Sequence, residues 1–87
     1  MQKKKISGIY CIENISTNKK YIGQSISITE RWQKHKYELN HSIHDNDYLQ
    51  KAWNKYGESD FRFYILKYCE ADELDEFEKY YIEYYHT

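Results

Sequence analysis

Two kinds of apolar pattern alternate along this chain. Short runs of β-branched and aromatic residues predict strands, whereas apolar positions spaced three or four residues apart predict helices. In chain order, the predicted elements are strands over Ile6–Glu13 and Lys19–Ser25, helices over Ile28–Leu39 and Asp47–Tyr56, a strand over Phe61–Cys69 and a helix over Asp72–Tyr84. This β-β-α-α-β-α order, with no proline, repeat or low-complexity linker, predicts one compact α/β (α+β) domain over residues 1–87 with a small mixed or antiparallel sheet.

Local signals mark the ends of the two central helices. Ser27, with Glu30 three residues later, has the pattern of a capping box at the start of the first helix. Asn46 or Asp45 precedes the second helix as a cap, and Gly57 stands where a glycine is expected just past a helix C-terminus. A polar connector with two histidines, His41 and His44, therefore joins these helices.

Two glycines lie inside strand-like tripeptides, Gly8-Ile9-Tyr10 and Tyr21-Ile22-Gly23, which are ten residues apart. Glycine weakens a strand by roughly 0.5–1 kcal/mol relative to alanine, so we expect another group to approach the backbone at Gly8 and Gly23. The polar stretch 14–18 predicts a hairpin turn between the tripeptides. A loop of even length pairs odd with even positions and places Tyr10 and Tyr21 on one face. A plain structural hairpin with core tyrosines is the alternative.

Length and composition exclude several classes of protein. A chain of 87 residues with eleven tyrosines has room for one modest core and is not disordered. No stretch approaches about 18 consecutive apolar residues, and the N-terminus lacks a signal-type apolar run, so we expect a cytoplasmic protein that does not enter membranes. Cys11 and Cys69 lie in strand-like segments, where we expect reduced packing residues rather than a disulfide.

The net charge of −1 hides an asymmetry along the chain. Residues 1–44 contain eight basic and three acidic side chains, whereas residues 45–87 contain five and eleven. One half could face a polyanion while the other stays solvated, which weakly favours nucleic acid as a partner.

Two polar residues interrupt the apolar stripe of the first helix. Ile28, Trp32 and Leu39 define that stripe, and His35 falls inside it. Arg31 lies four residues before His35 and therefore on the same face. A hydrogen-bonded core histidine would explain His35 alone, but an arginine beside a core usually binds a carboxylate or a phosphate.

The last helix repeats this anomaly with a carboxylate. Its apolar face is traced by Leu74, Phe77, Tyr81 and Tyr85, and Glu78 projects into the middle of that face. A buried carboxylate needs a protein cation, a metal ion or a proton. A structural bridge between Glu78 and Arg31 is the simplest alternative to a functional site.

The second helix, by contrast, is interpreted as structural. One arc, assigned to the core, contains Tyr48, Leu49, Ala52, Trp53 and Tyr56. The residues outside this arc are Gln50, Lys51, Asn54 and Lys55.

Together these residues resemble the GIY-YIG nuclease superfamily. Both naming tripeptides occur letter for letter, at a spacing typical of the family. The segment Arg31-Trp32-Gln33-Lys34-His35 resembles the Arg-X-X-X-His helix of the homing-endonuclease branch, and Glu78-Lys79-Tyr80-Tyr81-Ile82 resembles its metal-binding segment. The resemblance covers nearly the whole chain.

The resemblance implies a three-stranded antiparallel sheet flanked by helices and a metal-dependent DNA endonuclease that leaves 5′-phosphate and 3′-hydroxyl ends. Glu78 would hold one Mg²⁺ or Mn²⁺ ion, and Arg31 would stabilise the transition state. Tyr10 or Tyr21 would take the proton of the attacking water with help from His35, and we favour Tyr10. Gly8 and Gly23 would be the backbone positions that the substrate approaches.

Two departures from the family pattern lead to further expectations. The family usually has an asparagine after the last helix, and no clear equivalent precedes Thr87, so the chain is either a truncated catalytic module or lacks that support. The family also often has a separate DNA-binding domain, which is absent here, so we expect weak, salt-sensitive DNA binding. We interpret the chain as a nuclease domain of a phage or mobile-element homing endonuclease. The alternatives are an inactive module that binds DNA or protein, and a repair nuclease.

Overall fold

The structure, a computed structural model, describes residues 5–86. Its strands are β1 (Gly8–Asn14), β2 (Lys19–Ser25) and β3 (Phe61–Tyr68), and its α-helices are α1 (Ile28–Asn40), α2 (Asp47–Tyr56) and α3 (Leu74–Tyr85). Short 3₁₀ turns, Glu58–Asp60 and Ala71–Glu73, precede β3 and α3. The predicted β-β-α-α-β-α order is confirmed. The chain end at Thr87, which bears on the expected truncation, lies outside the described residues.

The sheet is antiparallel throughout, with strand order β2-β1-β3. In the β1–β2 hairpin, Tyr10 pairs with Gly23 and Ile12 pairs with Tyr21. Because cross-strand partners share a face and residues two apart on a strand do too, Tyr10 and Tyr21 lie on the same face. The predicted register of the hairpin is therefore confirmed.

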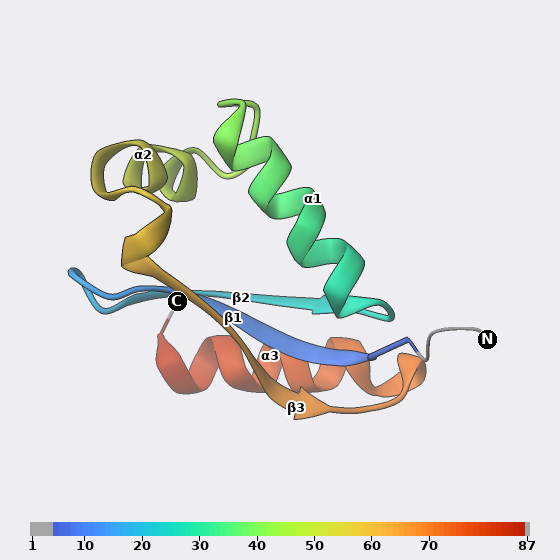
Figure 1. Ribbon diagram of the computed structural model, residues 1–87. Helices are drawn as coiled ribbons and strands as arrows, with labels where there is room; N and C mark the ends of the chain where they lie inside the picture. The colour runs from blue at the N-terminus through green and yellow to red at the C-terminus, as the bar shows by residue number, and fades with distance from the viewer. Residues whose placement is uncertain (1–4, 87) are drawn as a thin grey trace.

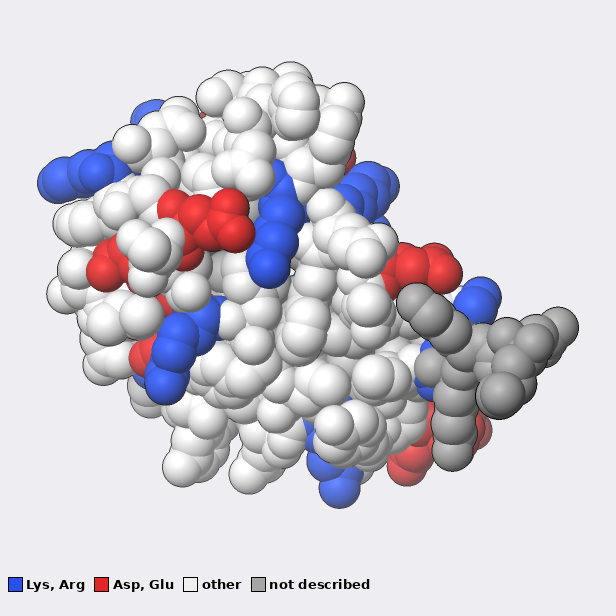
Figure 2. All heavy atoms as spheres, in the orientation of Figure 1, with Lys and Arg blue, Asp and Glu red and all other residues white. Residues whose placement is uncertain are grey.

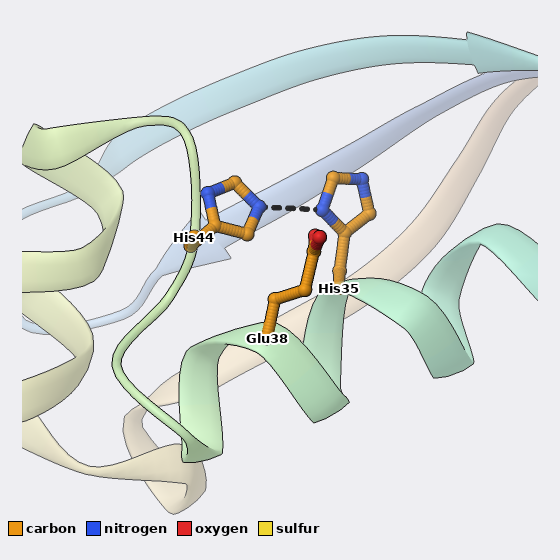
Figure 3. A group of neighbouring side chains, drawn as sticks. All are labelled: His35, Glu38 and His44. Carbon is orange, nitrogen blue, oxygen red and sulfur yellow. Dashed lines mark hydrogen bonds between the residues drawn. The ribbon is translucent and has the colours of Figure 1, made fainter.

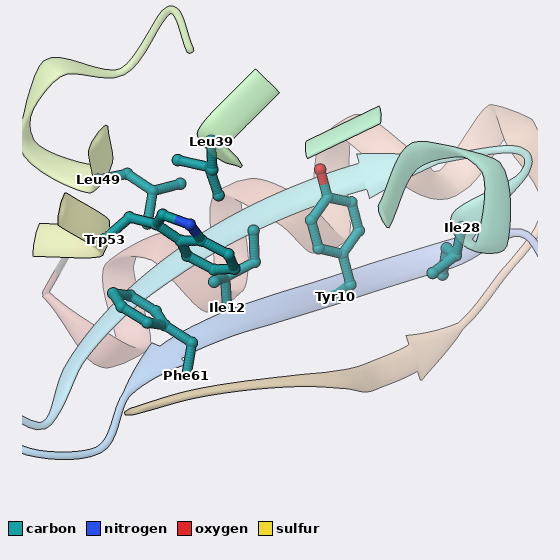
Figure 4. Packing of buried hydrophobic residues seen from close by; sticks show 7 residues of the cluster. All are labelled: Tyr10, Ile12, Ile28, Leu39, Leu49, Trp53 and Phe61. Carbon is teal, nitrogen blue, oxygen red and sulfur yellow. The ribbon is translucent and has the colours of Figure 1, made fainter. Parts of the chain in front are cut away.

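The sheet separates two packed layers. Figure 1 shows α1 and α2 over one face and α3 along the other, where α3 packs mainly against β2 and β1. The even positions of β1 point toward α1 and α2 and contribute to a buried cluster. The cluster contains Tyr10, Ile12, Ile28, Leu39, Leu49, Trp53 and Phe61 (Figure 4). The odd positions Ile9 and Cys11 point toward α3 and are fully buried.

A buried carboxylate connects the three strands on the α3 face. Glu13 accepts a 2.8 Å hydrogen bond from Arg62 of β3 and lies 3.4 Å from the Lys20 ammonium group of β2. These contacts hold the pKa of Glu13 below its usual value, with Arg62 the largest cause. Glu13 thus stabilises the register of both neighbouring strands.

The predicted helix ends are partly confirmed. Asn46 caps α2 by accepting a 3.0 Å hydrogen bond from the Leu49 amide, and Gly57, just past the C-terminus of α2, has a φ of 86°. Ser27 is at the N-cap of α1, but its side chain makes no capping bond, so the capping box predicted with Glu30 is wrong. The Ser25 hydroxyl accepts the Ser27 amide hydrogen instead.

The prediction for α2 is wrong at two positions. Tyr48, assigned to the core, is 75% exposed, whereas Gln50, placed outside it, is 9% exposed. The Gln50 amide group donates to the Leu39 carbonyl at the end of α1 (2.9 Å), and its side-chain oxygen accepts from the His44 amide (3.0 Å). A buried glutamine on α2 therefore fixes the connector between α1 and α2.

Three general expectations can also be compared with the structure. Cys11 and Cys69 are free thiols, as predicted. No helix in the described part of the chain is long and apolar enough to span a membrane. On the face shown in Figure 2, basic side chains are scattered among acidic ones, so the charge asymmetry along the sequence does not form one basic patch there.

A close approach occurs at both strand glycines, but the approaching group belongs to the chain itself. A Cβ atom at Gly8 would collide with the Lys67 carbonyl oxygen of β3, and one at Gly23 would collide with the end of the Tyr10 ring. Gly8 is buried, so the packing of β1 against β3 accounts for this glycine. At Gly23 the missing side chain leaves room for Tyr10. Approach of substrate to either glycine stays a prediction.

Gly23→Ala is expected to cost about 1–3 kcal/mol of unfolding free energy, because overpacking forces the Tyr10 ring to move. In a Tyr10→Leu background, whose shorter side chain leaves that space free, the same change should cost almost nothing. Denaturant unfolding of the four proteins measures both costs. Equal costs in the two backgrounds would contradict this explanation of Gly23.

Candidate active site

The candidate site lies at β2, an edge strand of the sheet. Tyr10 reaches it from β1. Its side chain is only 3% exposed, and its ring rises toward α1 over Gly23 (Figure 4). The Tyr10 hydroxyl is 2.7 Å from His35 Nε2. The buried ring thus fixes one oxygen between the edge strand and α1.

Helix α1 supplies two of the predicted residues. Arg31 and His35 are one turn apart, as their spacing requires. Trp32 lies between them and packs edge-on against Tyr10 with a ring separation of 6.2 Å, which holds α1 at a fixed height over the sheet. Arg31 is exposed and lies close enough to Tyr10 to act on its pKa, while His35 is half-buried.

His44 is a further member of the site, which the sequence analysis placed only in a polar connector. His44 Nε2 is 2.7 Å from His35 Nδ1, and the two rings stack with centroids 5.0 Å apart (Figure 3). The Asn46 amide donates to His44 Nδ1 over 3.0 Å. The connector folds back on α1 and thereby brings His44 to His35. The spacing of the two residues in the sequence does not predict this contact.

Glu78 approaches the same edge strand from the opposite face of the sheet. It is half-buried on α3 and accepts a 3.2 Å hydrogen bond from Gln24 of β2. The same Gln24 amide group donates to Asp75 over 2.7 Å. Within residues 5–86 the only ion pairs are those of Glu13, so the proposed structural bridge between Glu78 and Arg31 is not formed.

Opposing effects act on the Tyr10 hydroxyl. Burial, the largest, raises the pKa of Tyr10, the Arg31 guanidinium lowers it, and the Glu78 carboxylate raises it, so the net shift is upward. The pKa of His35 falls to about 4, first through burial and then through the charges of His44, Arg31 and Lys34. His35 is therefore a neutral imidazole near pH 7.

Tyr21 is less closely connected to the other candidate residues than Tyr10 is. It lies on the same face as Tyr10 and is half-buried, and burial raises the pKa of its hydroxyl. Among the described residues its hydroxyl has no side-chain hydrogen-bond partner. Tyr21 lines an open hollow of about 280 Å³ between β2, the start of α2 and α3, together with Lys19 and Lys20.

Two groups of side chains could hold a cation. Glu78 with neighbouring Asp75 offers carboxylate oxygens, the ligands that Mg²⁺ prefers. Ligand atoms of His35, Glu38 and His44 all lie within 4.8 Å of one another, a donor set closer to the preference of zinc (Figure 3). The expected magnesium ligand and the histidine pair are thus separate clusters.

Comparison with known proteins identifies the family of the chain. The family described as the GIY-YIG catalytic domain matches residues 6–87. The chain is 39% identical over 51 residues to Intron-associated endonuclease 1 of Enterobacteria phage T4, a match covering 59% of this chain and 21% of that protein.

Solved structures match over more of the chain. The catalytic domain of homing endonuclease I-TevI superposes with a TM-score of 0.86 at 33% identity, covering 92% of this chain and 88% of that domain. A mutant of the catalytic domain of intron endonuclease I-TevI gives the same TM-score at 32% identity, covering 93% and 84%. Because the family match spans residues 6–87 and the fold superposes on a solved catalytic domain, this chain belongs to the GIY-YIG family of catalytic domains.

Proposed function

We propose that this domain is a metal-dependent DNA endonuclease that hydrolyses phosphodiesters by water attack. The observation that carries the proposal is the convergence of Tyr10, Arg31, His35 and Glu78 on one edge strand from three different elements. A strand edge leaves an open side at which a long polymer can lie.

Tyr10 is the proposed general base. Tyr10 first loses its own proton to solvent, and its phenolate oxygen then takes a proton from the attacking water. The hydrogen bond with neutral His35 and the positive charge of nearby Arg31 stabilise the phenolate. Burial opposes this ionisation by raising the pKa of Tyr10, so positive charge at the site is essential. Tyr21, without a hydrogen-bonded partner in the described part of the chain, is the positioning group.

Arg31 is the proposed binder of the scissile phosphate. It is exposed and borders a hollow of about 290 Å³ whose lining also includes Lys5 and Lys34. Guanidinium groups bind phosphate oxygens through paired hydrogen bonds and stabilise charge that grows in the transition state.

Glu78, supported by Gln24, is the proposed ligand of a single Mg²⁺ or Mn²⁺ ion. Magnesium sites commonly use one or two carboxylates together with substrate phosphate, and the half-buried Glu78 beside Asp75 fits that donor set. When bound, the ion supplies positive charge to the scissile phosphate and the leaving oxygen.

The proposed hydrolysis exchanges one bond at phosphorus for another. The water oxygen bonds to phosphorus as the water gives one proton to the Tyr10 phenolate. The bond from phosphorus to the 3′-oxygen breaks, and that oxygen takes up a proton from solvent. The products are a 5′-phosphate and a 3′-hydroxyl.

The chain spans about a fifth of the phage protein that it matches, so the activity of a complete homing endonuclease is part of the proposal. The net charge of −1 and the scattered basic side chains of Figure 2 favour weak, salt-sensitive DNA binding by the domain alone. We infer that a separate DNA-binding domain supplies affinity and target choice.

Glu78→Gln is expected to lower Mg²⁺-dependent plasmid nicking by about 10²-fold or more, because loss of charge stabilisation costs several kcal/mol. Glutamine preserves shape and the contact with Gln24, so thermal unfolding should change little. Glu83→Gln, an exposed position on the same helix, is the control and should keep full activity. Nicking by the wild type in EDTA, or by the Glu78→Gln variant at the wild-type rate, would contradict the metal assignment.

Tyr10→Phe is expected to lower the nicking rate roughly 10²–10⁴-fold, the usual effect of losing a general base. Tyr21→Phe should have a smaller effect, since its hydroxyl lacks the contact with His35. Single-turnover cleavage of a plasmid measures both rates. A larger loss for Tyr21→Phe would exchange the two roles, and a covalent tyrosyl–DNA adduct would make the tyrosine a nucleophile.

The pKa of His35 predicts a pH dependence of stability. The unfolded chain binds a proton below about pH 6.5, whereas folded His35 resists protonation until about pH 4, so unfolding free energy falls as the pH drops through this window. His35→Gln should show a shallower decline, measured by denaturant unfolding at several pH values. Parallel curves for the two proteins would show that His35 is not buried as a neutral group.

A further inference from the structure

A row of hydrogen bonds leads from a backbone amide to Tyr10. The Asn46 N–H group is 3.0 Å from His44 Nδ1, His44 Nε2 is 2.7 Å from His35 Nδ1, and His35 Nε2 is 2.7 Å from the Tyr10 hydroxyl. Each of the three inner groups can either donate or accept. The backbone amide, however, can only donate.

This one fixed donor determines every proton position in the row. Because His44 Nδ1 accepts from the Asn46 amide, it carries no proton, and His44 carries its proton on Nε2. His44 Nε2–H then donates to His35 Nδ1, which leaves His35 as a neutral ring with its proton on Nε2. His35 Nε2–H therefore donates to the Tyr10 oxygen.

The reverse direction fails at the other end of the row. If the Tyr10 hydroxyl donated to His35, then His35 would donate to His44, and His44 Nδ1–H would face the Asn46 N–H. Two donors would then meet over 3.0 Å with no acceptor between them. Neutral His35 consequently cannot accept the Tyr10 proton while this row is intact.

The proton positions of His35 and His44 also argue against a metal ion between these two rings. A neutral histidine that binds metal through Nε2 carries its proton on Nδ1, the position already taken by the Asn46 N–H. The proximity of Glu38 does not change this constraint. The cluster in Figure 3 is therefore a hydrogen-bonded pair rather than a zinc site.

We propose that the Asn46 amide, acting through His44 and His35, makes Tyr10 a hydrogen-bond acceptor, with His44 as a positioning residue. The consequence for catalysis rests on the proposed nuclease function. The Tyr10 proton points away from His35, and a phenolate at Tyr10 receives the His35 N–H. Arg31, which lies near enough to lower the pKa of Tyr10, can also only donate.

The direction of the row can be read directly by nuclear magnetic resonance. The full 87-residue chain, labelled with ¹⁵N-histidine, is measured at about pH 8, above the ordinary histidine pKa. We expect the shared proton to show its one-bond coupling to His44 Nε2, with Nδ1 unprotonated in both rings. A one-bond coupling to His35 Nδ1 would overturn the proposal.

Zinc addition tests the competing interpretation in the same sample. We expect the shared proton and its coupling to persist with equimolar Zn²⁺. Loss of that proton, with shifts of both facing nitrogens, would assign the cluster to a metal and overturn the proposal.

Paired variants test the positioning role of His44. His44→Gln keeps an N–H donor near the former Nε2, whereas His44→Leu removes it. We expect roughly tenfold or greater loss of cleavage in the leucine variant, less than a full general-base loss of about 10²–10⁴, with most activity retained in the glutamine variant. His41→Gln, an exposed histidine of the same connector bonded to the Tyr37 carbonyl, is the matched control.

Equal rates for the glutamine and leucine variants would overturn the positioning role. The two proposals can fail separately. A chain that cleaves no DNA but carries the shared proton on His44 would remove the nuclease function and leave the direction of the row intact.

Discussion

The position of the Tyr10 ring across Gly23 is the constraint on which the rest of the site depends. The ring belongs to the buried cluster, yet its hydroxyl emerges at the edge strand beside α1. Any side chain at position 23 would displace it. The contact between the Tyr10 ring and Gly23 therefore affects both the stability of the fold and the geometry of the site. The packing that buries the ring also determines where its oxygen lies.

At an edge strand, side chains from the two opposite faces of the sheet can lie close together. Arg31 and His35 come from a helix on one face, and Glu78 comes from a helix on the other. A central strand would keep these groups apart by its neighbours on either side. Near β2, Arg31 and Glu78 both act on the Tyr10 hydroxyl, and because their charges are opposite in sign, Arg31 lowers its pKa and Glu78 raises it.

Burial has a cost for the proposed chemistry and also a benefit. Burial raises the pKa of Tyr10, which opposes formation of a phenolate. Together with neighbouring positive charges, burial also lowers the pKa of His35 to about 4, which keeps that ring neutral. A neutral histidine can still donate one hydrogen bond, whose direction the connector between α1 and α2 determines. The buried Gln50, which binds the backbone of that connector, thereby links core packing to the state of the site.

The sequence by itself determined the element order and the hairpin register, and it singled out Tyr10, Arg31, His35 and Glu78 as candidate site residues. Strand alternation, helical spacing and motif identity are local properties of the chain. The burial of Gln50 and the exposure of Tyr48 depend on which surfaces face each other, so periodicity alone gave wrong expectations there. Only tertiary structure brought His44 to His35, since that contact requires an irregular connector to fold back on a helix. The direction of its hydrogen bonds depends on a single backbone amide, a group that every residue except proline carries and no sequence pattern distinguishes.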